Sequence, residues 1–325
     1  MAPESWKGIV FCLVTAAIVS LLLGPVLIPL LRRLKFGQRV RDDGPRRHLS
    51  KAGTPTMGGL MFLAGIAVAS LLWAPRDGEL FTVLLVTLGY GLIGFIDDFI
   101  KVVKKRPLGL RAREKLSGQI GLGVLLGAAA VWGLNRGTAV SVPFTDVSLE
   151  LGGWYLLFAL LVLVSAGNAV NLTDGLDGLA ASTVFWSAAA YVFISLALGK
   201  TSLACFAAAL AGGCLGFLFY NRFPAKVFMG DTGSLALGGG LGALAVLTGT
   251  ELGFLIIGGV FVLETLSVII QVISYQTTRR RVFLMSPLHH HFELAGWAEP
   301  QVVRLFSITA FIFAVLGVIG VLHWT

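Results

Sequence analysis

The stretch Ile9-Val-Phe-Cys-Leu-Val-Thr-Ala-Ala-Ile-Val-Ser-Leu-Leu-Leu-Gly-Pro-Val-Leu-Ile-Pro-Leu-Leu31 contains no charged residue, and Arg32 and Arg33 follow it directly. A helix of about 20 apolar residues crosses a hydrocarbon core of about 30 Å. The stretch is therefore predicted to span a membrane. It is too long for the apolar part of a secretory signal, and only Lys7 precedes it as a basic residue, so we expect it to be retained.

Similar apolar runs recur along all 325 residues, of which 56% are hydrophobic and 13% are charged. A soluble domain of this length has no way to bury so much apolar surface. Because the runs are continuous rather than alternating, they favour helices over barrel strands. We expect spans at 9–31, 56–74, 80–99, 116–134, 153–172, 178–198, 202–220, 232–250, 252–277 and 302–322. The predicted fold class is an all-α polytopic membrane protein with about ten transmembrane helices, forming one domain over residues 1–325.

Two further features carry no chemistry. One is a loop between predicted spans, and the other is the placement of the cysteines. Residues 135–152 contain two short alternating segments around a Pro-Phe-Thr-Asp turn, which predicts a small periplasmic β-hairpin. The cysteines Cys12, Cys205 and Cys214 all fall inside predicted spans. We therefore expect packing residues and no extracytoplasmic disulfide framework.

The distribution of the 25 Lys and Arg residues predicts the orientation, because basic loops are retained on the cytoplasmic side. The loop after the first span holds Arg32, Arg33, Lys35, Arg39, Arg41, Arg46, Arg47 and Lys51, and the loop after the third holds Lys101, Lys104, Lys105, Arg106, Arg111, Arg113 and Lys115. The opposite side receives only Lys7, Arg76, Arg136 and Lys200. Both termini are thus expected on the outer side of the membrane. Topology and attraction to anionic lipid headgroups explain most of these arginines, and no nucleic-acid partner is expected.

Polar residues interrupt the apolar pattern at a few places. Asp97 and Asp98 end the third span, where ionisable groups are costly and usually functional, although a solvated helix end is the alternative. Asn168, Asn171 and Asp174 are spaced three apart and share a helical face at the end of the fifth span. Gly175, Asp177 and Gly178 follow. The glycines allow close backbone approach to a ligand, and the acids are alternatively helix caps.

Two further motifs lie in later loops. Asp231 stands between Gly230 and Gly233 at the start of the eighth span, where backbone N–H groups favour phosphate, although a capped helix start is the alternative. His289, His290 and His291 follow the ninth span; three successive imidazoles cannot all face one metal, so we expect them to bind an anionic substrate or move a proton. Glu264, Ser267 and Gln271 share one face of the ninth span, in a structural or a catalytic role.

With ten spans, the Asp pair, the Asn/Asp run, the Gly-Asp-Thr-Gly loop and the His triplet all emerge on the basic, cytoplasmic side. Carboxylate oxygens without cysteine indicate Mg²⁺ rather than Zn²⁺. The pattern favours phosphoryl transfer at the membrane surface between a soluble phosphate donor and a lipid acceptor. A secondary transporter is the alternative class, but its site would be expected near the bilayer midplane.

At these motifs the chain closely resembles the bacterial phospho-N-acetylmuramoyl-pentapeptide transferases, a branch of the polyprenyl-phosphate N-acetylhexosamine-1-phosphate transferase superfamily. The resemblance runs nearly end to end. It includes Lys51-Ala-Gly-Thr-Pro-Thr56-Met-Gly-Gly, Asp97-Asp98, Asn168 to Gly178, Phe228-Met-Gly-Asp231-Thr-Gly-Ser and Pro287-Leu-His-His-His-Phe-Glu. The last of these segments looks specific to this branch.

The resemblance implies transfer of phospho-MurNAc-pentapeptide from UDP-MurNAc-pentapeptide to undecaprenyl phosphate, which gives lipid I and UMP. It implies Asp231 as the Mg²⁺ ligand, Asp97 as the base that deprotonates or positions the lipid phosphate, and Asp98 as its support. It further implies phosphate-holding or ordering roles for Lys115, Asn171, His289 and His290, and a substrate pocket lined by Lys51, Thr56, Asn168, Asp174, Gly175, Asp177, Asn221, Phe228 and His291, with Phe228 stacked on uracil. A sister enzyme that transfers GlcNAc-1-phosphate to the same lipid is the nearest alternative. A homodimer remains open.

Overall fold

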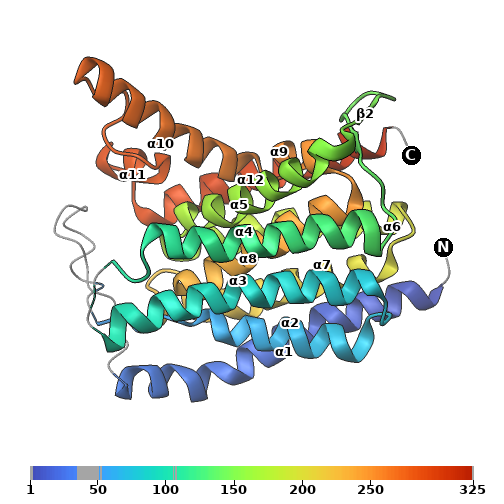
Figure 1. The fold of residues 1–325 in the computed structure, drawn as a ribbon. Helices are drawn as coiled ribbons and strands as arrows, with labels where there is room; N and C mark the ends of the chain where they lie inside the picture. Colours follow the sequence, from blue (N-terminus) through green and yellow to red (C-terminus); the bar gives the residue numbers. More distant parts are fainter. Residues whose placement is uncertain (1–2, 35–50, 52, 105, 107, 324–325) are drawn as a thin grey trace.

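The structure, a computed structural model, describes residues 3–34, 51, 53–104, 106 and 108–323, so most of the basic loop after the first span lies outside the described residues. The described chain is a helical bundle with one small sheet (Figure 1). Its elements are α1 (Pro3–Arg33), α2 (Gly59–Trp73), α3 (Gly78–Val103), α4 (Ala112–Ala128), η2 (Ala129–Gly133), β1 (Ala139–Ser141), β2 (Ser148–Glu150), η3 (Gly152–Trp154), α5 (Tyr155–Thr173), α6 (Leu179–Ala197), α7 (Thr201–Asn221), α8 (Gly230–Thr248), α9 (Glu251–Ile257), α10 (Gly259–Thr278), α11 (Leu288–Leu294) and α12 (Glu299–Leu322).

Eight of the described helical segments are long and apolar enough to cross a membrane. The prediction of a polytopic helical membrane protein is therefore confirmed, whereas the count of ten spans is not. The second predicted span corresponds to α2, which has 15 residues and falls short of the usual length. The eighth corresponds to α8, which does not meet the same criteria of length and hydropathy.

The ninth predicted span, 252–277, is divided between α9 and α10 rather than forming one helix. The break lies at Gly258 and Gly259, and a Cβ at Gly259 would lie 2.6 Å from the ring of Phe313 in α12. Two glycines in sequence weaken the helix, and the close approach of α12 favours a bend at the same point. Beyond the break α10 leaves the bundle at a steep tilt (Figure 1).

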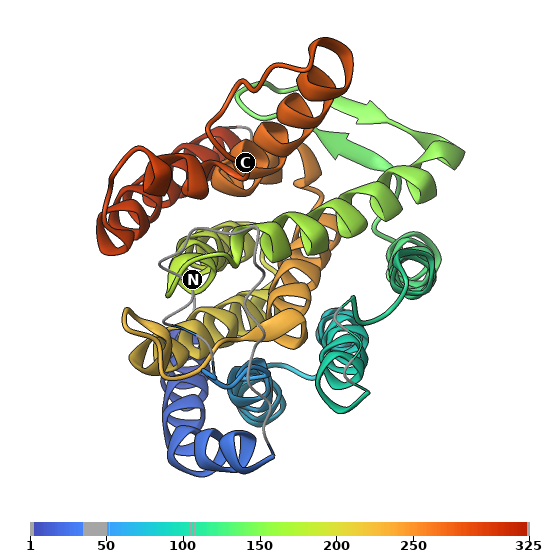
Figure 2. The ribbon, with the colours of Figure 1, turned by 90° about the vertical axis from the view of Figure 1, so that its left-hand side faces the viewer.

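Helix α8 occupies the centre of the bundle, as the end-on view in Figure 2 shows. Residues 232–248 are all buried, and the helix packs against α2, α3, α5 and α6. Small residues allow this closeness: a Cβ at Gly238 would lie 2.4 Å from the carbonyl oxygen of Ala166 in α5. Such contacts between small residues are the usual means by which membrane helices associate.

The predicted hairpin is present as β1 and β2, which pair antiparallel with Val140 opposite Leu149. It lies near both chain termini, at the end of the bundle opposite α11 (Figure 1). A buried ion pair anchors this end, because Arg136 donates to both carboxylate oxygens of Glu251 at 2.8 and 3.0 Å. The three cysteines are buried and free, as expected.

Candidate active site

Three carboxylates meet where the end of α3 crosses the start of α8. One ligand atom each of Asp97, Asp98 and Asp231 lies within 4.8 Å of the others, which makes them a possible metal-binding group. The crossing is close because Gly94 has no side chain: a Cβ there would lie 2.1 Å from the carbonyl oxygen of Asp231. We call these three residues the carboxylate cluster.

Two lysines compensate the charge of the carboxylate cluster. The ammonium of Lys101 lies 2.5 Å from Asp97 Oδ2, 3.1 Å from Asp231 Oδ2 and 3.9 Å from Asp98 Oδ1. Lys115 Nζ lies 2.7 Å from the same Asp231 oxygen. Two positive charges against three negative ones leave about one negative charge at the cluster when all five groups are ionised, so the site attracts a further cation.

The other oxygen of Asp231 is held from α5. Asn171 donates from Nδ2 to Asp231 Oδ1 at 3.0 Å and to Ser234 Oγ at 2.7 Å. Asn168, one turn earlier, instead donates to Gln119 in α4 at 2.9 Å and to the carbonyl of Val164. Of these two amides, the structure therefore brings only Asn171 to the carboxylate cluster by a hydrogen bond.

Both carboxylate oxygens of Asp98, unlike those of Asp97, accept hydrogen bonds from the start of α8. Its Oδ1 accepts from the backbone N–H of Asp231 at 3.2 Å, and its Oδ2 accepts from the N–H and hydroxyl of Thr232 at 2.9 and 2.7 Å. A side chain of α3 thus caps the start of α8. These two N–H groups, which the sequence suggested for phosphate, already have an anionic partner.

A second group of charges lies between three segments distant in sequence. Lys51 Nζ donates to Asp177 Oδ1 and to Glu299 Oε1, both at 2.6 Å. Asp177 Oδ2 accepts from the backbone N–H of Ala225 at 2.8 Å. Asn221 joins the same loops through the backbone of Gly178 and Val227 and is itself buried.

Phe228 and Thr56 lie beside these groups. The backbone of Phe228 pairs with the loop before α2, donating to the carbonyl of Pro55 at 2.8 Å and accepting from Gly58 at 2.8 Å. The ring centre of Phe228 is 6.0 Å from Lys51 Nζ. Thr56 is nearly buried, and a Cβ on Gly230 would meet both its hydroxyl and Asp98. The segments 55–59 and 228–230 thus lie side by side.

The three histidines of α11 have different partners. His289 is buried with Nδ1 3.0 Å from Glu264 Oε1, and a Cβ on Gly175 would lie 2.1 Å from its Nε2. His290 pairs with Glu293 at 2.9 Å, and His291 accepts from the N–H of Leu284 at 3.2 Å. Glu264 thus orients His289, whereas Gln271 bonds the backbone of Val282 and Phe283.

Asp174 ends α5 directly before Gly175. Burial raises the pKa of its carboxyl to about 8, and the negative charges of Asp231 and Asp98 act in the same direction. Lys51 opposes this shift. Asp174 therefore holds a proton at neutral pH while no additional cation is bound nearby.

Sequence reasoning missed several members of the site. Lys101 follows Asp97 by one helical turn, and Ser234 follows Asp231 by three residues, so helical spacing was sufficient to find both. Glu299 belongs to none of the motifs and lies far along the chain from Lys51 and Asp177. No local pattern indicates it.

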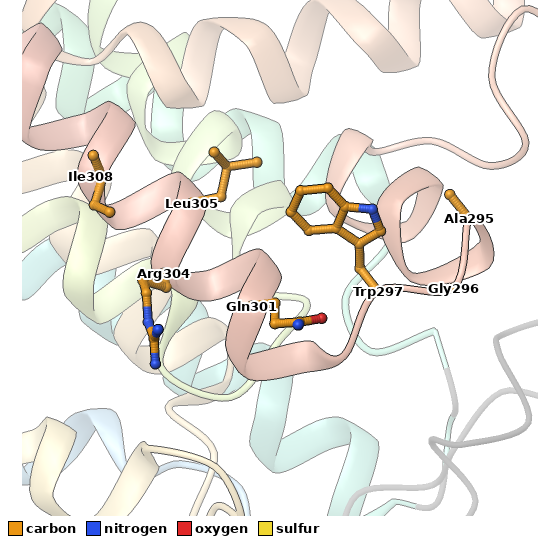
Figure 3. Close-up of a pocket in the computed structure, with 7 residues that line it drawn as sticks. All are labelled: Ala295, Gly296, Trp297, Gln301, Arg304, Leu305 and Ile308. Atoms are coloured by element: carbon orange, nitrogen blue, oxygen red, sulfur yellow. The ribbon is translucent and has the colours of Figure 1, made fainter.

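A separate cavity of about 490 Å³ lies at the loop before α12 and the first turns of that helix (Figure 3). It is lined by Ala295, Gly296, Trp297, Gln301, Arg304, Leu305 and Ile308. None of the predicted site residues lines this cavity, so it is distinct from the carboxylate cluster.

Comparisons with known proteins agree with the motifs. Residues 80–249 match the model of glycosyl transferase family 4, and residues 51–63 match signature 1 of phospho-N-acetylmuramoyl-pentapeptide-transferase. Proteins called phospho-N-acetylmuramoyl-pentapeptide-transferase are similar over nearly the whole chain: that of Desulforamulus reducens is 60% identical over 93% of this chain and 92% of its own length. That of Moorella thermoacetica is 58% identical, over 94% and 96% respectively, and that of Desulfitobacterium hafniense 56%, over 97% and 98%. The chain therefore belongs to the phospho-N-acetylmuramoyl-pentapeptide-transferase family.

Proposed function

We propose that the protein transfers phospho-MurNAc-pentapeptide from UDP-MurNAc-pentapeptide to undecaprenyl phosphate, giving lipid I and UMP. The observation that carries this proposal is the carboxylate cluster, in which three acids from two helices meet two lysines and an amide at one end of a membrane bundle. The relatives named above support the muramoyl-pentapeptide reaction over the GlcNAc alternative.

The residues of the carboxylate cluster fit a magnesium ion. All three offer carboxylate oxygens, and the ammonium of Lys101 lies within 4 Å of an oxygen of each, so the position already favours a cation. Asp231 is the proposed ligand, with Asp97 and Asp98 beside it. A bound Mg²⁺ would neutralise charge on the diphosphate of the donor.

The acceptor is activated, in this proposal, by Asp97. One oxygen of Asp97 is fixed by the N–H of Leu110 at 2.9 Å, and the other faces Lys101. Asp97 takes a proton from the lipid phosphate or orients it. An oxygen of that phosphate attacks the phosphorus attached to MurNAc, the bond from this phosphorus to the oxygen of UMP breaks, and UMP leaves. Direct displacement is favoured because the lipid phosphate is already a competent nucleophile.

The donor lies, we propose, against Lys51, Asp177 and Phe228, with uracil stacked on the ring of Phe228. Stacking of a base on an aromatic side chain contributes about 1–3 kcal/mol. His289 and His290 contact phosphates or order the site, and Lys115 and Asn171 hold Asp231 in place. The proposal also assigns six residues to the lining of the donor pocket: Thr56, Asn168, Asp174, Gly175, Asn221 and His291.

The site faces the cytoplasm of a bacterium in this proposal, with both termini and the hairpin outside the inner membrane. The distribution of basic residues supports this orientation.

The decisive experiment is a UMP-release assay with purified protein, undecaprenyl phosphate and Mg²⁺, using either UDP-MurNAc-pentapeptide or UDP-GlcNAc as donor. We expect UMP and lipid I with the first donor only. Release with UDP-GlcNAc alone would replace the proposal by the sister reaction. Loss of release on chelation, and its return with Mg²⁺, tests the metal separately.

A further inference from the structure

We propose that Glu299 is a positioning residue of the donor site, acting through Lys51 and Asp177. The inference rests on the proposed function, because that function assigns Lys51 and Asp177 to the donor. Glu299 lies in the first turn of α12, in none of the motifs that identified the site. Its side chain is nevertheless only 9% exposed and directed at two of the proposed donor residues.

One oxygen of Glu299 makes both of its contacts. Oε1 accepts from Lys51 Nζ and from the backbone N–H of Asp177, each at 2.6 Å. Charge-assisted hydrogen bonds of this length are about twice as strong as neutral ones. Glu299 therefore fixes a side chain from the first loop and the backbone of the loop after α5 at the same point.

Lys51 lies between two carboxylates rather than in a simple pair. Asp177 is 2% exposed and Lys51 15%, so neither charge is strongly screened by water. With Glu299 present, Lys51 is shared and the group carries about one net negative charge. Without the Glu299 carboxylate, Lys51 would pair with Asp177 alone, and the N–H of Asp177 would lose its acceptor.

Loss of the Glu299 contacts also affects Phe228, on which uracil is proposed to stack. Lys51 Nζ stands 6.0 Å from the ring centre of Phe228, while Asp177 Oδ2 holds the backbone of Ala225 in the loop that leads to Phe228. Displacing Lys51 and Asp177 therefore changes the position of a cation and of an aromatic ring together. Among the described residues, the side chain of Glu299 bonds Lys51 and Asp177 and none of the carboxylate cluster, so the chemical step should be spared.

The experiment compares Glu299→Gln with the parent enzyme in steady-state kinetics. Gln keeps the size and one acceptor oxygen but removes the charge. We expect KM for UDP-MurNAc-pentapeptide to rise by about tenfold or more, since the hydrogen bond from Lys51 loses its charged acceptor. We expect kcat and KM for undecaprenyl phosphate to stay within about twofold, as for uniform binding of one substrate. Glu150→Gln in the hairpin removes the same charge at the opposite end and should change neither constant.

Two further variants separate the possible failures. Lys51→Met and Asp177→Asn should themselves raise the donor KM; if neither does, the donor assignment in the proposed function is wrong. If both do and Glu299→Gln does not, only the role of Glu299 is wrong. The double variant Lys51→Met, Glu299→Gln should raise KM by less than the product of the single effects, because both remove the same contact.

Stability is the control for a merely structural role. Removing one partner of a buried ion pair destabilises many proteins. The midpoint of thermal unfolding is therefore measured for each variant in the same detergent. The variant Glu299→Asp keeps the charge on a shorter side chain and should restore part of the donor affinity lost in Glu299→Gln. Equal losses in kcat and in affinity for both substrates, accompanied by a lower unfolding midpoint, would overturn the inference.

Discussion

The carboxylate of Asp231 accepts from three side chains, those of Lys101, Lys115 and Asn171. Asp231→Asn keeps the shape and removes the charge. Loss of a group that merely orients a metal ligand costs about 10–100-fold in affinity or activity, so loss of the ligand itself should exceed that range. UMP release at saturating Mg²⁺ measures the effect, with size-exclusion chromatography to verify the fold. Near-normal turnover would reject Asp231 as an essential ligand.

Asp97 and Phe228 should give different kinetic signatures. Asp97→Asn removes a proposed base and is expected to lower kcat by about 10²–10⁴-fold. Phe228→Ala removes a proposed stacking surface and is expected to raise the donor KM with a smaller effect on kcat. Both constants come from the same UMP-release assay with each substrate varied in turn. Were Asp97→Asn to retain its rate but lose donor affinity, Asp97 would belong to the donor side.

Asp174 gives a prediction that depends on pH. Its pKa of about 8 in the folded protein exceeds the ordinary value of 3.8, so its ionisation disfavours the folded state. The penalty is absent below the ordinary pKa, grows between the two values and is complete above about 8. Asp174→Asn should therefore raise the thermal unfolding midpoint, relative to the parent, more at pH 8.5 than at pH 5.5. The comparison is made without added divalent cations; an equal gain at both pH values would contradict it.

Individual residues were predictable where chemistry was local. Asp97, Asn171 and Asp231 follow from helical spacing and from the cost of acids beside apolar segments, and the structure brings them together. Glu299 did not follow, because its partners are joined only by the folded chain. For Asp98, the sequence showed an acid at a helix end but not its role. Asp98 caps α8, and this contact depends on how α3 crosses α8.

At the level of elements, the crossing of α3 and α8 at Gly94 sets the geometry of the cluster. A Cβ at this position would lie 2.1 Å from the carbonyl oxygen of Asp231, so Gly94→Ala forces the two backbones apart. Overpacking of this kind costs about 1–3 kcal/mol. We expect a lower unfolding midpoint and a loss of UMP release that exceeds the loss of folded protein.

The matched control for this substitution is Gly121→Ala in α4. A Cβ at Gly121 meets nothing within 4 Å, so the change should leave activity unaltered and favour the helix by up to about 1 kcal/mol. If the two variants have the same UMP-release activity and the same unfolding midpoint, the crossing at Gly94 does not determine the geometry of the carboxylate cluster.

Helices and strands were predictable from the sequence where their pattern lies within one segment. Long apolar runs gave most helices and the alternating segments gave the hairpin, because each pattern is local. The break at Gly258 was missed, since two glycines within an apolar run are common in membrane helices and only the packing of Phe313 against Gly259 marks the bend.

For the whole molecule, the prediction is the orientation in the membrane. Asp146 lies exposed in the hairpin and Lys104 lies exposed after α3, at the opposite end of the bundle. Cysteine introduced at Asp146 should react with a membrane-impermeant maleimide in intact cells, whereas cysteine at Lys104 should react only after permeabilisation. The native cysteines are buried and serve as the unlabelled background. Labelling of both positions from outside would reject the orientation.

The position of α8 at the centre of the bundle has a consequence for how the chain is made. Because α8 is rich in glycine and is not apolar enough to qualify as a span, lipid alone would hold it less firmly than its neighbours. Its main partners α3 and α5 both precede it in the chain, so they emerge from the ribosome earlier. Packing against these helices therefore helps to hold α8 in the bilayer, and the carboxylate cluster is complete only once α8 has joined α3.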